Sequence, residues 1–181
     1  MSSELLIYTA IGAGSVAVIA TIILFARLAW RRQVRRYIVT LVGGREAVKT
    51  AFRTVGKVSE RLSVANDSEL IAFALDPSAE ERRTLGDIAE RMAISAEDLQ
   101  TVALPKRLRP AANTLADAAS LLGAQVVRAS SGEGVEVLDA LGEFDLVAVV
   151  SLLEAADAMI GALRERYGAV DDAVYGGGLY I

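Results

Sequence analysis

A single apolar run dominates the hydropathy pattern of this chain. Residues Leu5 to Ala26 contain no charged residue and no proline. A helix of that length reaches about 33 Å, enough to cross a hydrocarbon core of about 30 Å. A cleaved signal peptide is the alternative, but the preceding residues contain no Lys or Arg, and no small-residue cleavage site follows Phe25. The run therefore predicts a transmembrane helix within residues 1–30.

The charges that flank this run predict its orientation. None of the first 26 residues is Lys or Arg, whereas five arginines follow within ten residues: Arg27, Arg31, Arg32, Arg35 and Arg36. Positive flanks remain in the cytoplasm, so we expect a cell-membrane protein with its N-terminus outside and its C-terminal domain inside. Trp30 lies among these arginines, where an interfacial aromatic residue is expected.

Small residues recur at a spacing of four within the apolar run. The two pairs are Ala10 with Gly14 and Ala13 with Ala17. Such spacing lets two membrane helices approach closely, so we expect these four positions to contribute to helix packing in the membrane.

The next segment predicts a basic stalk, residues 31–44, that ends in a hinge at Gly43-Gly44. An amphipathic helix follows, with its cations at every fourth position: Arg45, Lys49, Arg53, Lys57 and Arg61. Two interpretations remain open for this cationic stripe. It is the solvated face of an ordinary core helix, or it contacts the anionic lipids of the inner leaflet, which is what we expect of it and of the five arginines that follow the apolar run.

Short capped helices are predicted in the middle of the chain. Asn66 opens a helix that Asp76-Pro77 ends. Ser78 caps a second helix that runs to about Met92, and Ser95 caps a third that Pro105 ends. Residues 84–95, TLGDIAERMAIS, resemble the helix-turn-helix of LacI-type repressors, which implies DNA binding. The recognition position instead carries Ala96-Glu97-Asp98, and residues 78–104 contain three arginines against six carboxylates. The resemblance thus defines an alternative function, a membrane-tethered DNA-binding regulator. Because of these carboxylates, we do not expect nucleic acid to be a partner.

Two long helices are predicted in the C-terminal half, from apolar residues that alternate at spacings of three and four. The first seam is Leu108, Ala112, Leu115, Ala119, Leu122, Val126 and Ala129. The second is Leu146, Val149, Leu153, Ala156, Ile160, Leu163 and Tyr167. Seams of this kind predict coiled-coil-like packing in an antiparallel bundle over residues 45–170. We expect residues 146–150 to be the most buried segment, and nearby carboxylates to exclude a second membrane anchor.

The residue inventory argues against catalysis. The chain has no His and no Cys, which removes the commonest general base, thiol nucleophiles and most transition-metal sites. No nucleotide-binding motif occurs, and no cofactor or metal site is expected. The net charge of −4 conceals a basic segment, residues 1–65, and an acidic remainder.

Residues 171–181 form a glycine-rich tail that ends in Leu179, Tyr180 and Ile181, which we expect to dock on a partner or on the chain itself. The sequence therefore predicts an all-α protein: one N-terminal transmembrane helix followed by a cytoplasmic antiparallel bundle. The expected function is non-enzymatic, the scaffolding or recruitment of protein partners, or of further copies of the chain, at an anionic membrane surface.

Overall fold

The computed structural model describes the backbone of residues 3–168 and the side chains of residues 21–168, and in this part every regular element is a helix. The helices are α1 (Ser3–Ser63), α2 (Asp67–Leu75), α3 (Glu80–Thr101), α4 (Arg109–Ser131), α5 (Val135–Gly142) and α6 (Leu146–Tyr167). The all-α prediction is confirmed for these residues.

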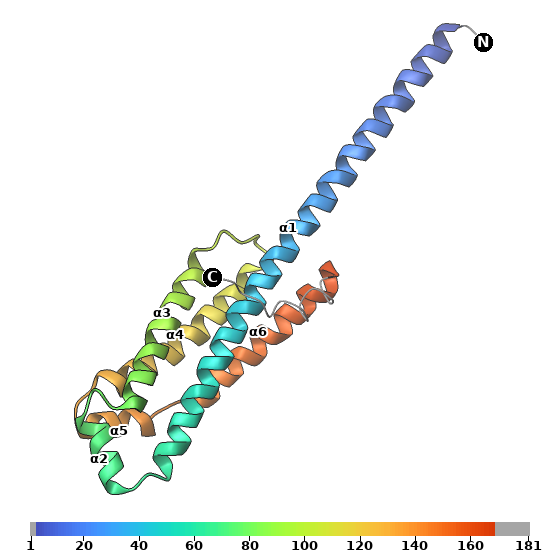
Figure 1. Cartoon of the computed structure of the whole chain (residues 1–181). Helices are drawn as coiled ribbons and strands as arrows, with labels where there is room; N and C mark the ends of the chain where they lie inside the picture. Colours follow the sequence, from blue (N-terminus) through green and yellow to red (C-terminus); the bar gives the residue numbers. More distant parts are fainter. Residues whose placement is uncertain (1–2, 169–181) are drawn as a thin grey trace.

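The long helices α1, α3, α4 and α6 form an antiparallel bundle, and α1 extends well beyond one end of it (Figure 1). α4 is central and packs against α3, α5, α6 and α1. The short helices α2 and α5 lie together at the opposite end, which we call the distal end (Figure 1). The end from which α1 projects is the proximal end, and the α3–α4 loop and the last turn of α6 are also there.

The core confirms the seams predicted for the two C-terminal helices. All seven predicted positions of the first seam are buried, and α4 also buries alanines on its flanks. In α6 the four central positions Val149, Leu153, Ala156 and Ile160 are buried. The prediction that residues 146–150 are the most buried segment is wrong, because α6 has neighbours on one side only at its start and Val147 is 79% exposed.

α1 is one continuous helix, so the break predicted at Gly43-Gly44 is absent. A Cβ atom on Gly44 would lie 3.3 Å from the side chain of Leu99 on α3. This glycine therefore allows α1 and α3 to approach closely, whereas Gly43 has open space around its Cα. Val34, Ile38 and Leu41, within the segment assigned to a stalk, are buried in the same core.

α3 is also continuous, and the turn required by a helix-turn-helix does not form. Residues 93–95 contain neither glycine nor proline, and the buried stripe continues through them from Met92 to Ala96 and Leu99. Because the packing stripe is uninterrupted, the helical hydrogen bonds of this segment are retained. The resemblance to LacI-type repressors therefore does not extend to the geometry that places a second helix in a DNA groove.

The predicted caps have mixed outcomes. Asn66 caps α2 as expected, accepting a hydrogen bond from the Glu69 backbone in a complete capping box. The Ser78 cap is wrong, because its hydroxyl donates to Asp76 at 2.7 Å and α3 begins after Ala79 instead.

Arg82 is the buried charged residue of the described core, with 3% of its surface exposed. Its guanidinium donates to the carbonyl oxygens of Ala74 (3.3 Å), Ser130 (2.8 Å) and Gly132 (2.5 Å). These carbonyls lie at the C-terminal ends of α2 and α4, where helix dipoles favour a cation. Arg82 thus joins three elements at the distal end.

Among the described residues, α6 is long and apolar enough to cross a membrane. It packs on α4 and α1 through its central apolar positions, and it carries Glu154 and Asp157. The expectation that α6 belongs to the bundle and not to a second anchor stays a prediction.

Candidate membrane-facing surface

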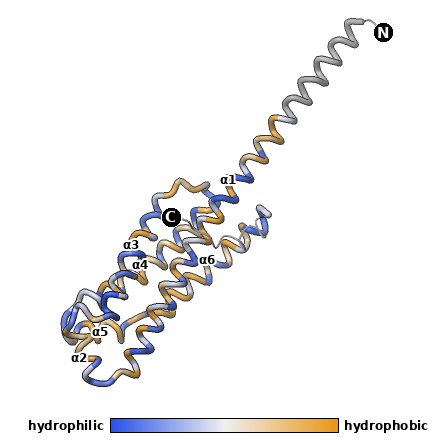
Figure 2. The backbone as a smooth tube through the Cα atoms, viewed as in Figure 1, coloured by the Kyte–Doolittle hydropathy of each residue, from blue (hydrophilic) through white to orange (hydrophobic). Residues whose placement is uncertain are grey.

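Large apolar side chains surround α1 just before it enters the bundle. Ile22, Ile23, Leu24 and Phe25 are each more than half exposed, and all side chains of residues 21–33 are exposed. Four consecutive helical positions at about 100° each cover nearly the whole circumference. This part of α1 therefore has an apolar surface on every side that no described part of the chain covers. In Figure 2 it is the hydrophobic segment of α1 that lies outside the bundle.

Cations from three separate segments gather at the proximal end, which is where this apolar surface stops. The segments are residues 27–36 of α1, residues 102–109 of the α3–α4 loop and residues 164–168 at the end of α6. Together they carry ten Lys or Arg and one carboxylate, Glu165. We call these ten residues the basic collar: Arg27, Arg31, Arg32, Arg35, Arg36, Lys106, Arg107, Arg109, Arg164 and Arg166.

Sequence reasoning identified the first five members of the collar and missed the other five. The missed residues lie in the part of the chain that is acidic overall, so charge counting along the sequence hid them. The antiparallel topology reveals them, because alternate helix junctions lie at the same end of an up-down bundle.

The three segments of the collar are in contact. Arg35 Nε donates to the backbone oxygen of Tyr167 at 3.4 Å, which joins α1 to the last turn of α6. Trp30, Pro105, Lys106, Arg107 and Tyr167 line a shared pocket of about 430 Å³. The proximal end thus combines exposed cations with two aromatic side chains, as interfaces with membranes do.

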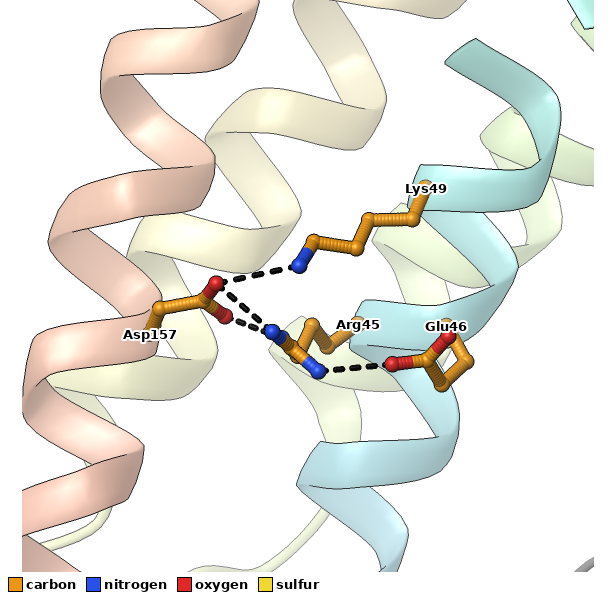
Figure 3. Close-up of polar contacts among 4 residues, drawn as sticks. All are labelled: Arg45, Glu46, Lys49 and Asp157. Atoms are coloured by element: carbon orange, nitrogen blue, oxygen red, sulfur yellow. Dashed lines mark hydrogen bonds and ion pairs between the residues drawn. The ribbon is translucent and has the colours of Figure 1, made fainter. Parts of the chain in front are cut away.

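The cationic stripe beyond Gly44 contacts other helices of the bundle at three of its five positions. Arg45 and Lys49 both approach Asp157 on α6 (Figure 3), with Arg45 Nη2 at 2.7 Å and Lys49 Nζ at 3.1 Å from Oδ2. Arg61 pairs with Glu81 of α3 at 2.9 Å. Arg53 and Lys57 are exposed. Three of the five stripe residues therefore join α1 to other helices.

The charge cluster at Asp157 shifts two pKa values, that of the Asp157 carboxyl and that of the Arg45 guanidinium. Hydrogen bonds from Arg45, and then from Lys49, lower the pKa of the Asp157 carboxyl against the opposing effect of burial. The hydrogen bond to Asp157 likewise raises the pKa of Arg45. Asp157 is thus an anion held between two cations, and its side chain is 31% exposed.

An open groove of about 620 Å³ separates α1 from α3. Ala47, Ala51, Ile88 and Met92 contribute apolar surface, and threonines line it from both helices. Ile94, which also lines the groove, is 53% exposed.

Several predicted sites fall outside the described residues. These are the expected packing positions Ala10, Ala13, Gly14 and Ala17, of which only the backbone is described, and the docking residues Leu179, Tyr180 and Ile181. Within the described residues, no three His, Cys, Asp or Glu side chains are grouped as metal ligands. In comparisons with known proteins, no protein-family model, no curated protein and no solved structure matches this chain.

Proposed function

We propose that this protein is a non-enzymatic, single-pass membrane protein whose cytoplasmic helical bundle recruits partner proteins to the inner membrane surface. The observation that carries this proposal is the basic collar. It gathers ten cations from three segments at the point where the apolar part of α1 leaves the bundle. Cations at that point favour an anionic, cytoplasmic leaflet by about 1 kcal/mol each near the surface.

The anchor in this proposal is the N-terminal part of α1. Its support is the uncharged run Leu5–Ala26, together with the exposure of the apolar residues at its end, Ile22 to Phe25. Insertion of this run in the membrane removes that apolar surface from water.

α6 is the competing span, and its charged residues favour a place in the bundle. Transfer of α6 into hydrocarbon separates Asp157 from Arg45 and Lys49 and carries Glu154 with it. A carboxylate at the centre of a bilayer costs about 2.5–3.5 kcal/mol on insertion scales. The N-terminal run carries no such cost.

The stripe beyond Gly44 is not expected to contact lipid. A straight α1 places Arg45 about 28 Å beyond Ala26 along the helix axis, and Arg61 farther still. The Debye length at physiological salt is about 8 Å, so attraction to headgroups has vanished at that distance. Lipid contact is therefore assigned to the basic collar.

Partner recruitment is the part of the proposal that the groove between α1 and α3 supports. We infer that an amphipathic helix of a partner lies along this groove, with apolar residues against the exposed side chains of Ala47 and Ile94. The DNA-binding alternative has lost its structural motif, because α3 is continuous.

The orientation is tested with a reporter that is active only in the cytoplasm, fused after Ile181. We expect activity from this fusion and none from a reporter that requires an oxidising compartment. The reverse pattern contradicts both the orientation and the proposed site of recruitment.

Recruitment is tested by placing a photo-crosslinking amino acid at Ile94 of the full chain in living cells. We expect a discrete protein adduct, because Ile94 lines the groove and is exposed. The matched control is Val147, which is more exposed but lies on α6 outside the groove. Equal adducts at both positions, or none at Ile94, argue against the groove as the recruiting surface.

A further inference from the structure

The pocket lined by Trp30 and Tyr167 is built from three parts of the chain that meet only in the folded bundle. α1 contributes Trp30, the α3–α4 loop contributes Pro105, Lys106 and Arg107, and the last turn of α6 contributes Tyr167. Its volume of about 430 Å³ falls within the range of small-ligand sites.

The loop that carries the two cations is held in place. Leu104 and Leu108, on either side of it, are 5% and 0% exposed. The Leu108 amide donates to the Pro105 oxygen at 2.8 Å, and Arg109 Nε donates to the Leu104 oxygen at 3.2 Å. Lys106 and Arg107 are therefore presented from a fixed backbone, which lowers the entropy lost when a ligand binds.

These two cations have no acidic partner in the described part of the chain. No carboxylate of the described residues forms an ion pair with Lys106 or Arg107, although other surface cations such as Arg61 and Arg128 have one. An ammonium beside a guanidinium, both exposed, is a combination that binds phosphate oxygens.

The depth of the pocket indicates which phosphate it meets. Trp30 lies four residues beyond Ala26, about 6 Å along the helix. The headgroup region of each leaflet is about 5–8 Å thick. The pocket is therefore level with lipid phosphates if α1 crosses the membrane as proposed.

We propose that this pocket binds the phosphate group of an anionic phospholipid of the inner leaflet. Lys106 and Arg107 contact the phosphate, and Trp30 and Tyr167 contact the glycerol and the first carbons of the acyl chains. This inference rests on the proposed membrane anchoring. A free phosphate ion shares the headgroup chemistry, but it offers nothing to the two aromatic side chains.

The test uses Trp30 as the probe, since it is the single tryptophan of the chain. The full-length protein is placed in phosphatidylcholine nanodiscs that contain a small, varied fraction of phospholipid brominated on its acyl chains, which quenches nearby tryptophan. We expect brominated phosphatidylglycerol to quench more strongly than brominated phosphatidylcholine at the same fraction, with a saturable excess. The Lys106→Gln/Arg107→Gln variant is expected to raise the half-saturating fraction about tenfold.

Two variants with the same loss of charge serve as controls. Arg53→Gln/Lys57→Gln removes exposed cations far from the pocket, and Arg31→Gln/Arg32→Gln removes members of the collar that do not line it. Arg53→Gln/Lys57→Gln is expected to leave the quenching unchanged. Arg31→Gln/Arg32→Gln is expected to weaken only the non-saturable attraction of the collar for anionic lipid and to leave the half-saturating fraction unchanged. An equal loss in Arg31→Gln/Arg32→Gln overturns the pocket, because the attraction is then a diffuse property of the collar.

The remaining outcomes separate this inference from the proposed function. Displacement of the excess by inorganic phosphate overturns the assignment to lipid. Equal quenching by the two brominated lipids overturns the pocket but leaves the anchor intact. Absence of quenching by either lipid contradicts the anchor itself, because Trp30 is then outside the membrane interface.

Discussion

Asp157 connects two helices that the sequence pattern treats separately. It accepts hydrogen bonds from Arg45 and Lys49, which lie one turn apart on α1, and it comes from the middle of α6 (Figure 3). Arg45 also contacts the carboxylate of Glu46 at 2.6 Å. The cluster is partly exposed, so each contact is screened by water, and its value depends on two cations sharing one anion.

Replacing Asp157 with Asn tests this cluster. We expect the free energy of unfolding to fall by about 1–2 kcal/mol at neutral pH, because the amide keeps the shape but removes the charge. The measurement is denaturant unfolding of the full chain in micelles, followed by helical circular dichroism. Glu154→Gln, an exposed change on the same helix, is the control and is expected to have little effect.

The pH dependence of this difference follows from the lowered pKa of Asp157. Since folding lowers that pKa, the stabilisation is fully present above the unfolded-state pKa of about 3.9 and is lost as pH falls through the lower folded-state pKa. The wild type and Asp157→Asn are therefore expected to converge in stability in strong acid. A gap that stays constant below pH 4 would assign the effect to shape rather than to charge.

Contacts between residues that are close in the sequence were predictable, whereas contacts between distant residues were not. The Asn66 cap was predictable because its partner, Glu69, lies three residues away. Arg82 was not, because its acceptors Ser130 and Gly132 lie about fifty positions along the chain. In the sequence Arg82 stands beside the exposed Arg83 with nothing to distinguish the two.

At the scale of elements, periodicity predicted helices and their faces better than their ends. The α4 seam was predictable because the same spacing persists through seven positions, all of which are buried. The interruptions predicted in α1 and α3 are wrong, since each rested on local propensity. Gly44 does not break the helix, because Leu99 of α3 packs close to its backbone where a side chain would otherwise lie. This tertiary contact outweighs the loss of helix stability that a glycine causes, about 1 kcal/mol.

The cationic stripe of α1 also shows what the periodicity of one helix leaves undetermined. Its spacing of four correctly indicated one face of a helix, but a single helix does not reveal which neighbour that face meets. Asp157 lies 108 residues from Lys49 along the chain, and Glu81 lies 20 residues from Arg61. Contact with lipid and contact with a carboxylate were therefore equally compatible with the pattern.

Over the whole molecule, charge is separated along the axis of the bundle. The proximal segments carry ten cations and one anion, whereas the distal residues 60–83 and 128–145 carry four cations and eleven anions. An anionic leaflet attracts the first group and repels the second. If α1 crosses the membrane as proposed, both effects favour a bundle that projects from the membrane on a straight α1, rather than one that lies along its surface.

This upright arrangement gives a prediction that probes at two heights can test. The chain has no cysteine, so Ala103→Cys and Ser63→Cys each introduce a single labelling site at an exposed position. Ala103 is in the α3–α4 loop at the proximal end, whereas Ser63 ends α1, about 55 Å beyond Ala26 along the helix. In anionic vesicles that carry a quencher on their headgroups, a fluorophore at Ala103 is expected to be quenched and one at Ser63 to remain bright. Detergent micelles without the quencher supply the unquenched reference. Strong quenching at Ser63 that disappears as salt rises would mean that the bundle lies on the surface, held there by Arg53 and Lys57, and that α1 does not stand upright.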